Sequence, residues 1–296
     1  SSNCQVASLN FSIGGRLIYF LPAWQRFGAD NLIKRDIKAC LIHQECPSIL
    51  QSNRYIPIEN RSEASMTALN QLINKKLEEK IIIEVQEKDL SRINPCFAIL
   101  KPGTNMWRKI IGCSILNKFL LSSHFIMEDF NTLRELRQKG DWMFKIDLHS
   151  AFHYIPVDPQ FQPFLGFTHK EKFYKYVVMC LGVKHAPLRF NKVFLLVIGI
   201  IKEHMGIRVV AYWDDAIFLD QNIEELMNKQ PLILKILEEF GWKISEGKSN
   251  LQIAQEVEFL NQITKSNQDQ IQTTLERRAQ MLKKCIMQKN IVQRKA

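Results

Sequence analysis

Two adjacent acidic residues, Asp214 and Asp215, lie between two short apolar runs of this 296-residue chain. Residues 207–210 before the pair and 216–218 after it are rich in β-branched and aromatic side chains, which is typical of two strands joined by a turn. A carboxylate that folding removes from water is costly unless a cation compensates its charge. The pattern therefore predicts a β-hairpin with two acidic side chains at its tip, where a metal ion would compensate their charge.

A third acidic residue, Asp147, ends another strand-like run at 142–148. Taken singly, an aspartate at a strand end or in a hairpin is usually a turn residue. Magnesium, however, prefers oxygen ligands and binds through one or two carboxylates together with substrate phosphates. The combination of the three aspartates favours a magnesium site over unrelated turns.

Helix signals occur in three places. Ser62 can cap a helix over 62–79, and two more helices are predicted over 187–205 and 223–240. Pro231 lies inside the last of these, where proline should kink the helix or restart it.

Strand signals occur between the helices. Apolar runs at 81–85, 96–100 and 109–113 predict strands, the last two joined as a hairpin by a polar loop. Because the key strands are joined by hairpins, we expect a mostly antiparallel sheet and an α+β fold. Residues 1–60 show no regular pattern and are expected to be irregular.

The chain is basic, with a net charge of +10, which favours a polyanionic partner, although a merely soluble basic protein remains an alternative. The segment 268–296 carries seven Lys or Arg against two Asp or Glu and is either a solvated helical face or a grip on a phosphate backbone. The longest apolar run, 193–201, is too short for a membrane span, so no membrane partner is expected. The cysteines form no Cys-x-x-Cys pair, which favours an intracellular location in cytoplasm or nucleus.

The stretches FKIDLHSAFHYIPVDP (144–159) and AYWDDAIFL (211–219) resemble the palm of reverse transcriptases. Four further stretches resemble, in the family's order, the fingers hairpin, the loop before the palm helix, the strand with a lysine near pyrophosphate, and the primer grip: NPCFAILKPGTNMWRKIIGCSILNK (94–118), MCLGVKHAPLRF (179–190), FGWKISEGKSNL (240–251) and VEFLNQI (257–263). Such an ordered set is far more specific than a Tyr-x-Asp-Asp motif alone. The segments GRLIYFLPAWQRF (15–27) and GIRVVAYWDD (206–215) look more like DIRS-like tyrosine-recombinase retrotransposons than retroviruses.

The resemblance implies roles for the catalytic residues. Asp147 and Asp214 would ligate two Mg²⁺ ions, for which Mn²⁺ is a possible substitute, and Asp215 would be an auxiliary ligand. Lys248 matches the candidate general acid that protonates the leaving pyrophosphate, with an ordinary strand-end lysine as the open alternative.

The resemblance also implies a binding site for the incoming nucleotide. Lys101 and Arg108 match the fingers residues that clamp its β- and γ-phosphates, a task that suits the planar fork of arginine. Ser150 and Ala151 would offer backbone N–H groups to the triphosphate. Phe152 would stand against the 2′ position of the sugar, or else belong to the core.

Three more residues complete this expected site. Leu181 and Gly182 belong to a loop that would pack under the nucleotide, and Tyr212 directly precedes the metal-binding turn. Between Tyr212 and the aspartates, Trp213 replaces the smaller or more flexible residue that is usual in the family.

The fold implied is a right-hand polymerase palm, an antiparallel sheet with helices behind it, plus fingers and with the thumb largely absent. We expect an N-terminal extension over 1–60, fingers and palm over 61–265, and a basic tail or the start of a thumb over 266–296. The implied function is RNA-directed DNA synthesis from deoxynucleoside triphosphates on an RNA or DNA template with a primer. Other polyprotein domains, RNase H and a recombinase or integrase, are expected elsewhere.

Two alternatives stay open. The family usually has an acidic residue and an arginine where this chain has Gly112 and Ser114, and it has Pro and Gly where Cys180 and Asn261 stand. These departures fit a catalytically decayed retroelement remnant that only binds nucleic acid. An RNA-dependent RNA polymerase would share the palm aspartates, but Phe152 argues against it, because such enzymes need a polar partner for the 2′-hydroxyl.

Overall fold

The computed structural model describes residues 11–34, 40–52, 61–122, 128–275 and 277–279. The chain forms two compact units: unit 1 is Ser1–Phe125, Ser150–Phe194 and Glu238–Trp242, and unit 2 is Ile126–His149, Leu195–Leu237 and Lys243–Ala296. Both contain helices and antiparallel sheets, which confirms the predicted α+β class. Among the described residues, no helix combines the length and the apolar character that a membrane crossing requires.

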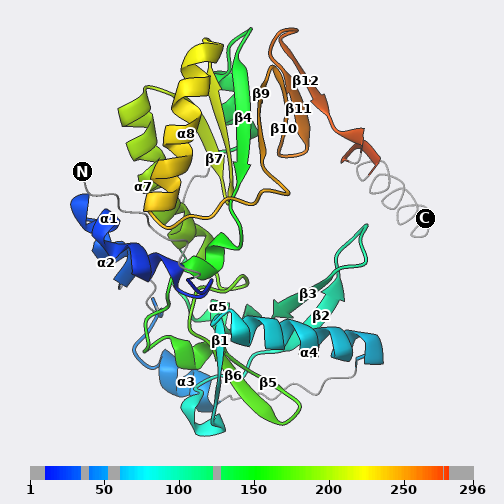
Figure 1. Ribbon diagram of the computed structural model, residues 1–296. Helices are drawn as coiled ribbons and strands as arrows, with labels where there is room; N and C mark the ends of the chain where they lie inside the picture. The colour runs from blue at the N-terminus through cyan, green and yellow to red at the C-terminus, as the bar shows by residue number, and fades with distance from the viewer. Residues whose placement is uncertain (1–10, 35–39, 53–60, 123–127, 276, 280–296) are drawn as a thin grey trace. The chain divides into compact units, whose positions relative to one another are not determined.

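Unit 2 is built on a four-stranded antiparallel sheet in the order β7-β8-β4-β9 (Figure 1). Its strands are β4 (Trp142–Asp147), β7 (Arg208–Tyr212), β8 (Asp215–Asp220) and β9 (Asn250–Ala254). The predicted hairpin at the acidic pair is confirmed, since β7 and β8 are joined by the two residues Trp213 and Asp214. Strand β4, distant in sequence, pairs with the other edge of β8.

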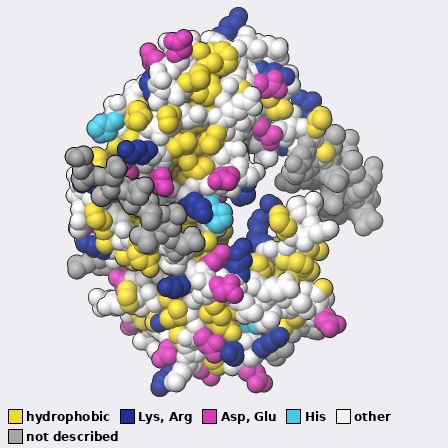
Figure 2. Space-filling view, in the orientation of Figure 1, with side chains coloured by type: hydrophobic (Ala, Val, Ile, Leu, Met, Phe, Trp, Pro, Cys, Tyr) yellow, Lys and Arg dark blue, Asp and Glu magenta, His cyan; other side chains and the backbone are white. Residues whose placement is uncertain are grey.

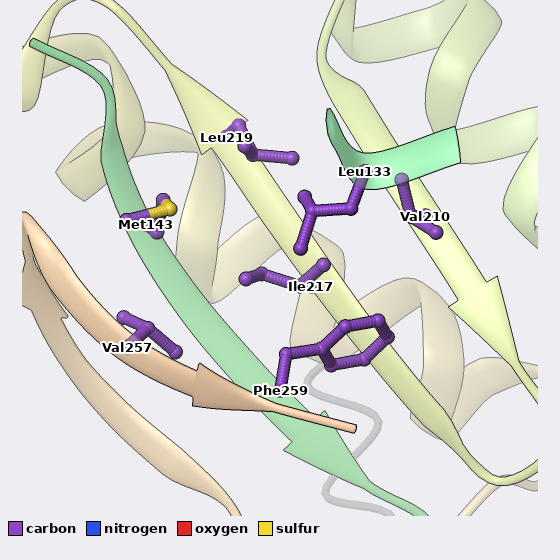
Figure 3. Close-up of a cluster of buried hydrophobic side chains, with 7 residues drawn as sticks. All are labelled: Leu133, Met143, Val210, Ile217, Leu219, Val257 and Phe259. Carbon is purple, nitrogen blue, oxygen red and sulfur yellow. The ribbon is translucent and has the colours of Figure 1, made fainter. Parts of the chain in front are cut away.

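One face of this sheet carries an apolar core, drawn in Figure 3. Its buried members come from four strands and the helix α6 (Phe130–Leu136): Leu133, Met143, Val210, Ile217, Leu219, Val257 and Phe259. Because successive side chains of a strand alternate between faces, Met143, Lys145 and Asp147 lie on this same face. The core therefore continues along β4 toward the acidic residue at its end.

Val257 and Phe259 belong to a separate three-stranded sheet of β10 (Glu256–Phe259), β11 (Gln262–Lys265) and β12 (Gln270–Thr273). The segment that resembles a primer grip forms the β10–β11 hairpin. Its two turn residues, Leu260 and Asn261, have φ angles of 52° and 60°. Asparagine tolerates this left-handed conformation, so the turn forms without the glycine usual in the family.

The opposite face of the main sheet carries Phe144 and Phe218, whose rings stack with centroids 4.8 Å apart. Helices α7 (Ala186–Met205) and α8 (Ile223–Glu239) run beside the sheet in Figure 1, close to the predicted ranges. Helix α8 continues through Pro231, so the predicted restart there is wrong. Proline leaves only the carbonyl four residues earlier without a donor, and that residue, Met227, is exposed to water.

Unit 1 contains the helix α4 (Glu63–Glu78), which begins as predicted, because the Ser62 hydroxyl accepts a hydrogen bond from the Ser65 N–H. A three-stranded sheet has the order β1-β6-β5, with β1 (Ile82–Val85), β5 (Gly166–His169) and β6 (Lys172–Tyr176). The short helix α5 (Ser114–Lys118) and 3₁₀ turns at Glu87–Asp89, Ala151–Tyr154 and Gln162–Leu165 connect these elements.

The predicted hairpin of unit 1 consists of β2 (Cys96–Leu100) and β3 (Trp107–Ile111). The second strand was expected over 109–113 and instead starts two residues earlier. The reason is the register, since Leu100 pairs with Trp107 and the loop between them is short.

The prediction that residues 1–60 are irregular is wrong for much of the described part. It forms a 3₁₀ turn (Arg16–Phe20) and the helices α1 (Leu21–Arg26), α2 (Asp30–Lys34) and α3 (Cys46–Ser52). Pro22 lies in the first turn of α1, where a missing N–H costs nothing. Trp24 is fully buried, and its indole N–H donates to the Phe240 carbonyl within unit 1.

The basic tail expected over 266–296 lies only partly within the described residues. Its first part forms β12, and the hydroxyl of Thr274 then accepts a hydrogen bond from the Arg277 N–H. Residues 280–296, with most of the basic side chains of the tail, lie outside the described residues.

Candidate active site

The three predicted carboxylates come together at one end of the sheet of unit 2. Asp147, the last residue of β4, is paired with Asp215, the first residue of β8. The next residue of the β4 segment, Leu148, donates its N–H to the Asp214 carbonyl at 2.8 Å. The backbone thus fixes Asp147 against the turn that carries Asp214, as the sequence predicted.

The backbone of Asp147 is also held from its other side. Its N–H donates to the Ser249 hydroxyl at 2.9 Å, and its carbonyl accepts from the Ser245 N–H at 2.8 Å. Both partners lie in the segment that leads into β9, whose sequence resembles the lysine strand of the family. The carboxylate of Asp147 is therefore placed on a rigid strand end rather than on a free loop.

Two lysines face these carboxylates from within unit 2. Lys248 Nζ lies 3.5 Å from Asp147 Oδ1, and Lys145 Nζ lies 3.7 Å from Asp215 Oδ1. Both carboxylate oxygens are buried and accept no hydrogen bond in the described part of the structure. The ammonium groups thus stand where a cation is needed without satisfying these oxygens.

Lys145 was not singled out from the sequence. A signal existed, because it lies two residues before Asp147 in a strand, and residues two apart share a face of the sheet. Lys248 was singled out, and the structure places its amine at the carboxylates. Its role as a general acid remains a prediction.

Burial and charge change the acidity of this site. Burial raises the pKa of Asp215 to about 6, with the Asp147 and Asp214 charges adding to the rise and Lys145 opposing it. Burial likewise raises the pKa of Asp214, with the Asp147 charge adding. Loss of hydration is thus a larger cause of the raised pKa values than repulsion between the carboxylates.

The donor set fits a hard divalent cation, since buried carboxylate oxygens without hydrogen bonds are the ligands that Mg²⁺ prefers. Among the described residues, however, no three His, Cys, Asp or Glu side chains are arranged to enclose a metal ion by themselves. Magnesium sites built on one or two carboxylates normally take their remaining ligands from water and substrate phosphates.

The predicted phosphate clamp lies in unit 1, on the β2–β3 hairpin. Lys101 opens the loop, with its N–H donating to the Met106 carbonyl at 2.8 Å. Arg108 lies on β3 opposite Ile99. Both basic side chains are exposed, so neither is committed to the core.

Ser150, Ala151 and Phe152 also belong to unit 1. Ser150 has a φ of 52° and leads into the 3₁₀ turn that contains the other two. Phe152 is only 7% exposed, and its ring stacks on Phe190 with centroids 4.3 Å apart. This packing gives Phe152 a place in the core, which the sequence had left open beside its contact with the sugar.

The loop with Leu181 and Gly182 is fixed by Asn117, which donates to the Gly182 carbonyl at 2.8 Å and accepts from the Lys184 N–H at 2.8 Å. Gly182 has a φ of 117°, and a Cβ atom there would lie 2.9 Å from the Ile111 carbonyl oxygen. Only glycine fits this position without strain. Leu181 is left exposed to solvent.

A sheet that gathers three carboxylates at one end, with lysines beside them, is the arrangement of a nucleotidyltransferase palm. The chain belongs to the reverse transcriptase (RNA-dependent DNA polymerase) family, whose model matches residues 65–264. Known structures share the fold: a foamy viral protease-reverse transcriptase in complex with dsDNA aligns over 76% of this chain and 46% of its own, with a TM-score of 0.63 and 21% identity. The same kind of protein in complex with an RNA/DNA hybrid aligns over 75% of this chain and 28% of its own, with a TM-score of 0.61 and 21% identity.

Curated relatives are long polyproteins. The Gag-Pro-Pol polyprotein of human T-cell leukemia virus 2 is 27% identical over 210 residues, which cover 68% of this chain and 14% of the relative. The Transposon Tf2-3 polyprotein of Schizosaccharomyces pombe is 27% identical over 217 residues, which cover 72% of this chain and 16% of the relative. The chain thus spans a small part of the length of the relatives that it matches.

Proposed function

We propose that this chain is the polymerase part of a retroelement polyprotein and carries out RNA-directed DNA synthesis. The reaction joins the primer 3′-oxygen to the α-phosphorus of a deoxynucleoside triphosphate and releases pyrophosphate. The observation that carries this proposal is the pairing of Asp147 with the Asp214–Asp215 turn. The desolvated, incompletely satisfied oxygens there require cations, and the nucleotide would bring phosphates to complete their coordination.

Asp147 and Asp214 would hold two Mg²⁺ ions, or Mn²⁺ in their place, with Asp215 as an auxiliary ligand. When bound, the ions supply a more acidic primer hydroxyl and charge neutralisation on the triphosphate. Lys248 would donate a proton to the leaving pyrophosphate. Lys145 would partly neutralise the charge of Asp215.

The family resemblance assigns nucleotide-binding roles to a further set of residues. Lys101 and Arg108 would contact the β- and γ-phosphates, the backbone of Ser150 and Ala151 would donate to the triphosphate, and Phe152 would border the sugar. The loop at Leu181 and Gly182 and the side chain of Tyr212 would complete the binding site. These roles follow from the family resemblance and from the exposure of the two basic side chains.

The expected partner is a template–primer duplex. Solved relatives are complexes with double-stranded DNA and with an RNA/DNA hybrid. The basic charge of the chain suits such a partner, although Figure 2 shows basic and acidic side chains interspersed on the face that it displays. Contact with the sugar–phosphate backbone of the duplex is expected. We assign the chain to DIRS-like elements on the segments 15–27 and 206–215, with further polyprotein domains elsewhere.

Primer extension on RNA and DNA templates, with Mg²⁺ and then Mn²⁺, tests the proposal. Extension on RNA that requires the metal is the expected result. Tight binding of the template–primer without any extension would instead establish the decayed, nucleic-acid-binding remnant, which the replacements at Gly112 and Ser114 favour.

A further inference from the structure

Glu128 precedes helix α6, and its carboxylate lies at the open edge of β7. In the described part of unit 2, β7 pairs with β8 on one side and with no strand on the other. The Ala211 N–H points to that open side and donates to Glu128 Oε2 at 2.7 Å. One side-chain oxygen thus takes the place of the carbonyl that a neighbouring strand would offer.

The other oxygen of the same carboxylate is also used. Lys202, in the part of α7 that belongs to unit 2, has its Nζ 3.1 Å from Glu128 Oε1. Both side chains are partly buried, so water screens this pair less than a surface pair. Glu128 therefore ties the edge strand β7 to helix α7 through a charge-assisted hydrogen bond and an ion pair.

The contact between Glu128 and the Ala211 N–H lies close in sequence to the turn that carries Asp214. Ala211 is followed by Tyr212 and then by Trp213, whose φ of 56° is a left-handed conformation that bulky residues rarely adopt. Such a conformation persists only where the surrounding structure enforces it. Strand β8 holds one edge of β7, and Glu128 holds the other.

The geometry points to Glu128 as a positioning residue of the polymerase site, which fixes β7 and thereby sets the place of Asp214. This inference rests on the proposed function, since positioning matters only if Asp214 takes part in catalysis. Glu128 acts through the backbone of Ala211 and is not itself a catalytic residue.

Three variants separate its two contacts. Glu128→Ala removes both, Glu128→Gln keeps an oxygen for the Ala211 N–H but loses the ion pair, and Lys202→Met removes only the cation. Glu128→Ala should lower kcat at least about tenfold, because small displacements of catalytic groups are costly, while KM for the nucleotide changes by less than about twofold. Hydrogen exchange of the Ala211 amide should become about tenfold faster. Glu128→Gln and Lys202→Met should retain most of the wild-type kcat and most of the slow exchange of the Ala211 amide.

Asp129→Ala is the matched control. Asp129 accepts hydrogen bonds from the Asn131 and Thr132 N–H groups and caps α6 next to Glu128. Its loss should lower thermal stability without changing kcat or the exchange of Ala211. A Glu128→Ala variant that behaves like this control, or a Glu128→Gln variant as impaired as Glu128→Ala, would overturn the inference.

The inference can fail separately from the proposed function. If the wild-type chain extends no primer, the proposed function is wrong, and Ala211 exchange still decides whether Glu128 holds the strand. Unchanged exchange in Glu128→Ala then refutes the positioning role, and faster exchange together with weaker Mn²⁺ binding supports it.

Discussion

In unit 1 the amines of Lys76 and Lys109 each have a neutral hydrogen-bonding partner, whereas in unit 2 the carboxylates of Asp147 and Asp215 lie beside lysines that do not satisfy them. Lys109 Nζ donates to the Tyr176 hydroxyl at 2.9 Å and lies 3.7 Å from the centroid of the Phe167 ring. Lys76 Nζ lies 3.1 Å from His153 Nε2. Residues of unit 1 thus provide hydrogen-bonding partners for both amines.

Burial shifts the pKa values of the amines in unit 1 and of the carboxylates in unit 2 in opposite directions. Burial, together with the nearby Lys109 charge, lowers the pKa of Lys76 to about 8, and burial also lowers the pKa of Lys109, so folding disfavours the charged form of both amines. Burial raises the pKa of Asp214 and Asp215 instead. An amine that can lose its proton when folding removes it from water needs no anionic partner. A carboxylate that must act as an anion needs a cation beside it.

The comparison separates two uses of charge. The half-buried lysine amines of unit 1 belong to its packing, and its candidate ligand-binding cations, Lys101 and Arg108, are exposed. In unit 2 the candidate catalytic anions are themselves buried. Charge burial alone therefore does not identify a site, and the unsatisfied carboxylate oxygens of Asp147 and Asp215 are what distinguish the candidate site in unit 2.

The largest expected effect contrasts the two kinds of buried group. Asp147→Asn keeps the size of the side chain but removes a metal ligand, and it should reduce single-nucleotide incorporation by about a thousandfold or more. Lys109→Met should change it by less than about threefold, because Lys109 packs inside unit 1. Template–primer binding should survive in both. Equal losses in the two variants would remove the distinction between site and packing.

Phe152 is a buried side chain of unit 1 that is also assigned to the nucleotide-binding site, so its replacement distinguishes a role in binding from a role in packing. If its edge borders the sugar, Phe152→Val should raise ribonucleotide relative to deoxynucleotide incorporation about tenfold to a hundredfold, since a buried, unpaired hydroxyl costs roughly 1–3 kcal/mol. If the ring only packs on Phe190, stability and both incorporations should fall together. Incorporation ratios on one primer, with thermal melts of both proteins, distinguish these results.

Arg108 and Lys109 are neighbours with opposite exposure. Arg108→Lys retains the charge but loses the planar fork, so kcat should fall about tenfold while nucleic-acid affinity stays within about twofold. Pre-steady-state incorporation at saturating nucleotide measures this change. An unaltered rate would show that Arg108 is an ordinary solvated side chain.

The smallest effects concern pH and should have opposite signs in the two units. The folded pKa of Asp215 is raised, so the stability that it contributes is present at low pH and is lost as pH rises through about 6. Asp215→Asn should therefore stabilise the metal-free protein by about 1 kcal/mol more at pH 7.5 than at pH 4.5.

Lys76 has a lowered folded pKa, and its contribution is lost as pH falls through about 8. Lys76→Met should accordingly stabilise more at pH 7 than at pH 9.5. Chemical unfolding in the presence of a chelator gives both differences. If the stability of both variants changed with pH in the same direction, burial would not act oppositely on Asp215 and Lys76.

Local sequence patterns were sufficient for the elements that carry the acidic residues. The β7–β8 hairpin, the strand ending at Asp147 and the helix ending before Gly206 follow from periodicity and turn residues, and the family resemblance located their pairing. The helices within residues 11–52 were missed, because each spans only five to seven residues and so shows little periodicity. Lys145 and Glu128 were missed because their contacts depend on register and on the free edge of a strand, which no local pattern records.

Manganese binding decides whether the carboxylate cluster of Asp147, Asp214 and Asp215 is the metal site. A chain bound to a template–primer with a dideoxy-terminated primer and the matching deoxynucleoside triphosphate cannot react, so the ions can be counted by electron paramagnetic resonance. We expect about two Mn²⁺ per wild-type chain and a marked loss of both in Asp214→Asn, with Asp220→Asn unchanged. Wild-type stoichiometry and affinity in Asp214→Asn would contradict the assignment of this carboxylate cluster as the metal site.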